Sequence, residues 1–361
     1  MTKTRRALVL VALSCTLLGA VSPGIVRPAQ SQASNPVRDD VAKFRDRASL
    51  TLASSGAEKG YWGVLVTDAD TGEILYALNP QRYFMPASNV KLFTTAMALA
   101  TLGPDFRIHT TIETTGALDR TGRLTGDVVL VGRGDANLSN RAFPYVGKVV
   151  REGPAEKILA ELADQVAAFG VKEIAGDVVA DDTYFVPARF PPGWTVDDTV
   201  WSYGAAVSPL AVNDNTLTIE VTPGIRAGAP LRYRVEPASR LYEVRNVGTT
   251  TAARTEPQLS LARDPESHVF VLGGTLPMGA AARELSVGVT EPAENAADQL
   301  ARLLEARGIR IKGRARARHP APSALPPATA PAARTVDPIV IAEHISPALI
   351  EDVRLTNKVS Q

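Results

Sequence analysis

The chain has 361 residues and a formal net charge of +1, and 45% of its residues are hydrophobic. This length and apolar content are typical of a globular protein of two or three domains with a sizeable core. The near-zero charge gives no indication of a nucleic-acid partner, and the single cysteine excludes both an internal disulfide and a cysteine-based metal site.

The first 33 residues have the layout of a secretory signal peptide. Three basic residues precede an apolar run over residues 7–21, and a small-residue site ends at Ala33. The run is shorter than the ~20 residues that span a membrane, so we expect cleavage after Ala33, with an uncleaved anchor as the alternative. Cys15 lies inside the run, which continues past it, so a lipid-modified cysteine is disfavoured. The sequence therefore predicts an exported protein, in a periplasm or an extracytoplasmic cell-wall space.

The mature chain is expected to open with a helix at 41–52, followed by a β-hairpin and a second helix. Residues 62–67 and 74–78 have strand character and flank an Asp- and Gly-containing turn. Residues 89–102 then form a helix that is apolar on nearly every side and ends at Gly103. A helix of this kind is normally buried in a large domain, so we expect this one to be buried.

The rest of the chain is richer in short strands. Strands and turns fill residues 108–289, interrupted by a helix at 155–169. The later expected elements are an amphipathic helix at 296–307, a strand at 309–315, a proline- and alanine-rich loop at 320–333 and a helix at 346–359. The chain is therefore expected to have an α+β fold.

Ser88 and Lys91 form the pattern that carries chemistry. Positions i and i+3 at the start of a helix share a face, so the lysine amine can reach the serine hydroxyl. A serine needs an adjacent base to act as a nucleophile, and a desolvated lysine can serve as that base. The alternative is a serine N-cap beside a solvated lysine. The hairpin before the motif, the apolar helix after it and the export signal favour serine–lysine hydrolysis.

The segment around this motif is similar to the active-serine segment of class C low-molecular-mass penicillin-binding proteins, the D-alanyl-D-alanine carboxypeptidase/endopeptidases. That segment is PASNVKLFTTA at residues 86–96. The preceding hairpin, with its DTG turn at 70–72, is similar to that of the family as well. Later similar segments follow in family order: GRGDANL at 132–138, GW at 193–194, YGA at 203–205 through NDN at 213–215, and HISPAL at 344–349 through NKVS at 357–360. The ordered set covers nearly all of the mature chain.

The resemblance implies a β-lactamase/transpeptidase-like catalytic domain with two inserted, mostly β domains. It places the incomplete catalytic domain at residues 34–108 and 290–361. Inserted domain II would comprise residues 109–150 and 245–289, and inserted domain III residues 151–244.

The resemblance also assigns the second catalytic motif, Ser-x-Asn, to the end of the chain. Ser360 occupies its serine position and Gln361 its variable position, and the sequence ends before the asparagine. The third family motif, Lys-Thr-Gly, does not occur in the sequence. Two interpretations stay open: a fragment of a longer reading frame that lacks the C-terminal part of the catalytic domain, or a truncated and inactive relative.

The function implied is that of a serine-type D-alanyl-D-alanine carboxypeptidase/endopeptidase that acts on peptidoglycan stem peptides through a Ser88 acyl-enzyme. The resemblance implies Lys91 as general base and Ser360 as a proton relay. Peptides ending in D-Ala-D-Ala and β-lactam antibiotics are the expected partners. No metal, cofactor or nucleic acid is expected to bind, and no stable membrane span is expected after signal cleavage. The alternatives are a β-lactamase or esterase on the same fold, or an inactive wall-binding relative.

Other candidate residues receive a structural interpretation. The Arg-Gly-Asp tripeptide at 133–135 is expected to be a turn, and Asp181 and Asp182 should point to opposite faces of a strand. Trp194 and Trp201 could line a sugar-binding surface or pack in a core. The four histidines are scattered, and the sequence has no Gly-x-Ser-x-Gly elbow, so a histidine metal pair and a Ser-His-Asp triad are disfavoured.

Overall fold

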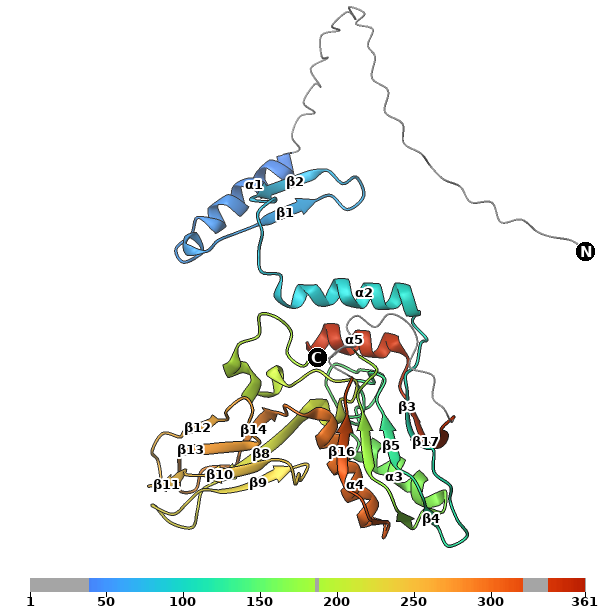
Figure 1. Ribbon diagram of the computed structural model, residues 1–361. Helices are drawn as coiled ribbons and strands as arrows, with labels where there is room; N and C mark the ends of the chain where they lie inside the picture. Colours follow the sequence, from blue (N-terminus) through green and yellow to red (C-terminus); the bar gives the residue numbers. More distant parts are fainter. Residues whose placement is uncertain (1–38, 186–187, 321–336, 361) are drawn as a thin grey trace, which may run out of the picture. The chain divides into compact units, whose positions relative to one another are not determined.

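The computed structural model describes residues 39–185, 188–320 and 337–360 (Figure 1). It divides into two compact units, Met1–Met85 and Pro86–Gln361. The predicted signal peptide, most of the loop at 320–333 and Gln361 lie outside the described residues.

The described part of the first unit is one helix packed on a hairpin. Helix α1 (Asp39–Leu52) precedes strands β1 (Val64–Thr67) and β2 (Ile74–Leu78), which pair antiparallel as predicted. Arg45 Nε donates a hydrogen bond of 2.5 Å to the carbonyl oxygen of Leu75, which joins the helix to β2. The hairpin predicted from the strand and turn pattern is confirmed.

The second unit contains a five-stranded mixed sheet. Its order is β16-β7-β5-β3-β17, with β16, β7 and β5 parallel and with β3 and β17 antiparallel to their neighbours. The strand bounds are β3 (His109–Thr114), β5 (Val128–Val131), β7 (Val178–Asp181), β16 (Ala315–Arg318) and β17 (Ile339–Ile345). A smaller parallel sheet consists of β4 (Arg123–Leu124), β6 (Glu173–Ile174) and β15 (Arg310–Ile311).

Two helices pack on the five-stranded sheet. Helix α3 (Lys157–Ala168) lies beside β17, and α4 (Pro292–Ala306) lies beside β7 and β16 (Figure 1). Both amphipathic helices were predicted, and α4 begins four residues earlier than expected because Pro292 occupies its first turn, a position that proline favours. The helices and the sheet share one hydrophobic core, which includes Leu130, Leu162 and Leu300.

The remaining strands form two further sheets around a second core. One is antiparallel, with the order β14-β8-β9, and the other places β13 between β10 and β11, with β12 also paired to β13. Their bounds are β8 (Thr216–Thr222), β9 (Arg232–Glu236), β10 (Glu243–Asn246), β11 (Thr249–Thr251), β12 (Gln258–Ala262), β13 (Val269–Pro277) and β14 (Arg283–Gly288). Phe270, Leu217 and Val287 are among the buried residues of this core.

The two cores divide the chain differently from the predicted boundaries. The prediction groups residues 290–361 with the Ser88 helix, whereas α4 and β16 belong to the core of the five-stranded sheet. It also separates residues 109–150 from 151–244, whereas β7 pairs with β5 in that same sheet. The physical reason is that hydrophobic periodicity identifies the buried face of a strand but not its neighbour in the sheet.

Helices α2 (Val90–Leu102) and α5 (Leu349–Val359) contact each other within the second unit (Figure 1). Contrary to the expected burial, α2 has no buried residue among those described, and Leu92, Phe93 and Met97 are 58%, 76% and 72% exposed. The contact with α5 covers one side of α2 and leaves these apolar side chains uncovered. Among the described residues, no helix combines the length and apolarity needed to cross a membrane.

Candidate active site

Ser88 lies in the turn that begins α2. It is the middle residue of a 3-10 turn, Ala87–Asn89, which continues directly into the helix. The preceding residue, Ala87, has a φ of 45°, a left-handed conformation that is costly for a residue with a Cβ. The side chain of Ser88 is exposed, and Lys91 Nζ lies 3.1 Å from its Oγ. The structure therefore brings the predicted nucleophile and base within hydrogen-bonding distance.

Ser360, near the C-terminal end of the second unit, lies beside both Ser88 and Lys91. It caps the C-terminus of α5 in a left-handed conformation, with φ 61° and ψ 43°. Lys91 Nζ donates a hydrogen bond of 2.5 Å to Ser360 Oγ, and the two serine oxygens are 3.4 Å apart. One amine thus contacts two hydroxyl groups whose residues are 272 positions apart.

A further hydrogen bond couples α2 to α5. Asn357 Nδ2 donates to Thr95 Oγ1 over 3.1 Å, and Thr95 Oγ1 donates to the carbonyl oxygen of Lys91 over 2.7 Å. Thr95 is one turn after Lys91, and Asn357 is nearly one turn before Ser360. Neither residue was assigned a role from the sequence, although each lies three or four positions from a candidate catalytic residue, the spacing of neighbouring positions along a helix.

The start of α5 is fixed by buried polar residues from the GRGDANL segment. Asp135 is fully buried, its Oδ1 accepts a hydrogen bond of 2.8 Å from the backbone N–H of Asn137, and its Oδ2 lies 3.4 Å from His344 Nε2. Asn137 Nδ2 in turn donates to Asp352 Oδ1 in the first turn of α5. The Arg-Gly-Asp tripeptide therefore anchors the helix that carries Ser360 and is not an exposed adhesion motif.

Burial shapes the electrostatics of this anchor. Desolvation raises the pKa of Asp135 to about 6, opposed by the hydrogen bond from Asn137 and reinforced by the charge of Asp352. Desolvation likewise raises the pKa of Asp352 to about 6, and burial lowers the pKa of His344. All three groups therefore favour their neutral forms more strongly than they do in water.

A large cavity adjoins the serine–lysine centre. It has a volume of about 830 Å³, and both Lys91 and Ser360 line it. Trp194, Tyr203 and Asp214 also line it, so segments far from the motif in sequence border the same space. Of the two candidate tryptophans, Trp194 lies at this cavity. A cavity of this size can accommodate a short peptide.

The other candidate carboxylates lie elsewhere in the second unit. Asp181 is buried and pairs with Arg318 at 3.0 Å, whereas Asp182 contacts His319 at 2.9 Å. The two aspartates therefore have different partners, as the alternation of side chains along a strand requires. Among the described residues, one group has the spacing of a possible metal site, namely Glu291, Glu294 and His319.

The family follows from comparison with known proteins. A family model described as the D-Ala-D-Ala carboxypeptidase 3 (S13) family matches residues 48–328, which is more than half of the chain. The chain belongs to this S13 family. The resemblance to D-alanyl-D-alanine carboxypeptidases of the penicillin-binding kind, expected from the sequence, is thereby confirmed.

Individual relatives of this S13 chain carry related names. It is 33% identical over 318 residues to a D-alanyl-D-alanine carboxypeptidase of Actinomadura sp. (strain R39), a match that covers 86% of the chain and 54% of the relative. It is 34% identical over 176 residues to carboxypeptidase DacB of Mycolicibacterium smegmatis, covering 49% of the chain and 34% of that protein. The chain thus spans about half the length of the first relative and about a third of the length of the second.

Solved structures of penicillin-binding protein 4 (dacB) from Haemophilus influenzae share the fold of this S13 chain. One has a TM-score of 0.63 at 20% identity and covers 81% of this chain and 58% of its own. A second, complexed with a β-lactam, has a TM-score of 0.60 at 18% identity, with coverages of 88% and 60%. These similarities confirm the predicted α+β fold with a transpeptidase-like part and inserted β-rich regions.

Proposed function

We propose that this chain supplies the acylation centre of a serine-type D-alanyl-D-alanine carboxypeptidase, with Ser88 as nucleophile, Lys91 as general base and Ser360 as proton relay. The observation that carries the proposal is the position of Lys91 Nζ, 3.1 Å from Ser88 Oγ and 2.5 Å from Ser360 Oγ. The names of the relatives support the substrate class, a peptide that ends in D-Ala-D-Ala.

The proposed reaction has two stages. In the first, the amine of Lys91, acting as general base, takes the proton of Ser88 as the serine Oγ forms an ester bond to the penultimate carbonyl carbon. The peptide bond to the terminal D-Ala breaks, and the leaving amine receives the proton from Lys91 through the hydroxyl of Ser360. In the second stage, water attacks the ester and releases the shortened peptide, while the same groups return the proton to Ser88.

The surroundings of Ser88 suit this chemistry. The serine is exposed beside the cavity of about 830 Å³, so an extended peptide can reach it. A β-lactam presents a strained amide to the same hydroxyl and should form an ester with it. One of the structural neighbours was solved in complex with a β-lactam, which agrees with this expectation for that protein. The export signal expected at the N-terminus would bring the enzyme to peptidoglycan outside the cytoplasm.

A fluorescent penicillin tests the proposal on the protein produced from its natural gene. We expect a covalent adduct that survives denaturation and is lost in Ser88→Ala. Ser202→Ala is the matched control, because Ser202 lines the same cavity and should leave labelling intact. Undiminished labelling of Ser88→Ala would refute the nucleophile assignment. Rapid hydrolysis of the penicillin without a lasting adduct would identify a β-lactamase, and no reaction by the folded protein would favour an inactive wall-binding relative.

A further inference from the structure

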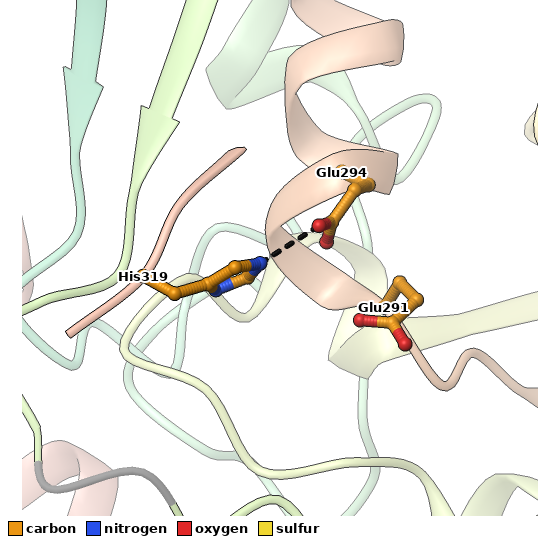
Figure 2. A group of neighbouring side chains, drawn as sticks. All are labelled: Glu291, Glu294 and His319. Carbon is orange, nitrogen blue, oxygen red and sulfur yellow. Dashed lines mark hydrogen bonds and ion pairs between the residues drawn. The ribbon is translucent and has the colours of Figure 1, made fainter. Parts of the chain in front are cut away.

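Two glutamates and a histidine converge at the start of α4, away from the serine–lysine centre. Glu291 is the N-cap of α4 and Glu294 lies three residues later, so both side chains project from one face of its first turn. His319 follows the end of β16 and points at Glu294, as Figure 2 shows. One potential ligand atom from each of the three residues lies within 4.8 Å of the others.

A fourth residue fixes the orientation of the histidine. Asp182, directly after β7, lies 2.9 Å from His319 Nδ1 on the side of the ring opposite Glu294. His319 Nε2 lies 2.8 Å from Glu294 Oε1. When Nδ1 donates its proton to a carboxylate, the Nε2 lone pair is presented to the opposite side. This carboxylate–histidine arrangement is the one that supports histidines bound to metals in proteins.

The site also has an unsatisfied acceptor and open space. Glu294 Oε2 is buried and has no hydrogen-bond partner among the described residues. A cavity of about 360 Å³ adjoins the cluster and is lined by Asp182, Glu291 and His319. A buried carboxylate oxygen without a partner is costly, and a cation bound there would satisfy it. The adjoining cavity would let water complete the coordination of such an ion.

Charge in the cluster is unbalanced when the histidine is neutral. Asp182, Glu291 and Glu294 bring three carboxylates, and Arg189, which pairs with Glu291, supplies one fixed positive charge. Burial of His319 opposes its protonation, but the hydrogen bond to Glu294 and the charge of Asp182 outweigh that effect and raise its pKa. A proton on Nε2 therefore balances part of the negative charge, and a divalent ion in its place would balance more.

We propose that His319, Glu294 and Glu291 bind a divalent transition-metal ion, of which Zn²⁺ fits the ligands best. One histidine nitrogen and two carboxylate oxygens with open positions for water are typical zinc ligands. Bond lengths of about 2.0–2.2 Å at a tetrahedral angle require roughly 3.3–3.6 Å between ligand atoms. His319 Nε2 and Glu294 Oε1 are 2.8 Å apart, so these two atoms must separate by at least about 0.5 Å to admit the ion, and a ligand atom of Glu291 lies within 4.8 Å of both.

The proposed ion would join three elements of the five-stranded sheet and its helix. Glu291 and Glu294 belong to the start of α4, His319 follows β16, and Asp182, which holds the histidine, follows β7. Zn²⁺ replaces the proton on Nε2, so binding to the protonated form releases one proton for each ion. The site is therefore a structural clasp between these elements, and it takes no part in the reaction at Ser88.

Calorimetric titration with ZnCl₂ tests the proposal on the metal-free protein near neutral pH, in two buffers of different ionisation enthalpy. We expect saturable binding of one ion per chain, accompanied by proton release. His319→Gln and Glu294→Gln should each weaken binding at least tenfold, and Asp182→Asn, which removes the support of the histidine, about 10–100-fold.

His109→Gln is the matched control, because His109 contacts a single carboxylate, Glu343, at 2.6 Å on an exposed surface and should leave Zn²⁺ affinity unchanged. Circular dichroism of each variant verifies the fold. Absence of saturable binding by the folded parent protein would overturn the proposal, as would equal affinity in the parent and in His319→Gln. Penicillin labelling of Ser88 is measured in parallel, so failure of the metal site is distinguishable from failure of the proposed enzymatic function.

Discussion

The variant Asp135→Asn removes the buried carboxyl group that anchors the start of α5. Asparagine has the shape of a protonated aspartate and keeps the oxygen that accepts the N–H of Asn137, while its amide can donate to His344 Nε2. At low pH, where Asp135 is protonated, parent and variant should have similar free energies of unfolding. Near neutral pH the variant should be the more stable protein.

The size of the expected difference in the free energy of unfolding follows from the pKa of Asp135. Its pKa is 3.8 in the unfolded chain and about 6 in the folded protein, so the carboxyl binds its proton more tightly when folded. The associated stability is fully present below pH 3.8 and is lost as the pH rises through about 6. The difference corresponds to about 3 kcal/mol, which is an upper limit because Asp135 and Asp352 titrate as a coupled pair.

Urea denaturation of both proteins across pH 4–8, followed by circular dichroism, measures this difference. Subtracting the two stability curves removes the contributions of titrating groups that do not interact with Asp135. We expect a difference of about 0.5 kcal/mol at pH 4 that rises to at most about 3 kcal/mol toward pH 7.5. Asp105→Asn, at an exposed position, is the control and should give a flat difference. A flat difference for Asp135→Asn as well would refute the reasoning.

Three further substitutions test the site and the two cores. Lys91→Met should slow penicillin acylation by about 10²–10⁴-fold, the usual contribution of a general base, as measured by stopped-flow labelling; an unchanged rate would exclude lysine as the base. Leu130→Ala should lower the free energy of unfolding by about 2–5 kcal/mol, because Leu130 is fully buried, and a smaller loss in urea denaturation would contradict the packing described. Gly274→Ala should lower the melting temperature more than Gly279→Ala does, although both glycines have positive φ. A Cβ at position 274 would lie 1.8 Å from the carbonyl oxygen of Gln258, whereas a Cβ at position 279 meets nothing within 4 Å. Equal shifts would show that this contact is relieved at little cost.

Local features were predictable because each depends on residues close together in sequence. The β1–β2 hairpin follows from two strand patterns around a turn, and α3 follows from its apolar stripe. The approach of Lys91 to Ser88 follows from their spacing at the start of a helix. In each case, backbone geometry over a few residues determines the outcome.

Features that depend on distant pairing were not predictable in the same way. Strand β7 lies between β5 and β16, and no local pattern specifies that neighbour. The cluster at His319 combines residues from separate segments, none of which carries a metal-binding spacing of its own. The exposure of α2 was missed for a related reason: an apolar helix indicates that its faces can be buried, but not which segment covers them.

The 272 positions between Ser88 and Ser360 determine when the proposed catalytic centre can form during synthesis. At roughly 5–20 residues per second, the ribosome needs about 14–54 s to make the stretch that separates the two hydroxyl groups. Strand β17, which precedes α5, must also find β3, made more than two hundred residues earlier. A nascent chain therefore contains Ser88 long before Ser360, and the proposed acylation centre can form only after Ser360 has been made.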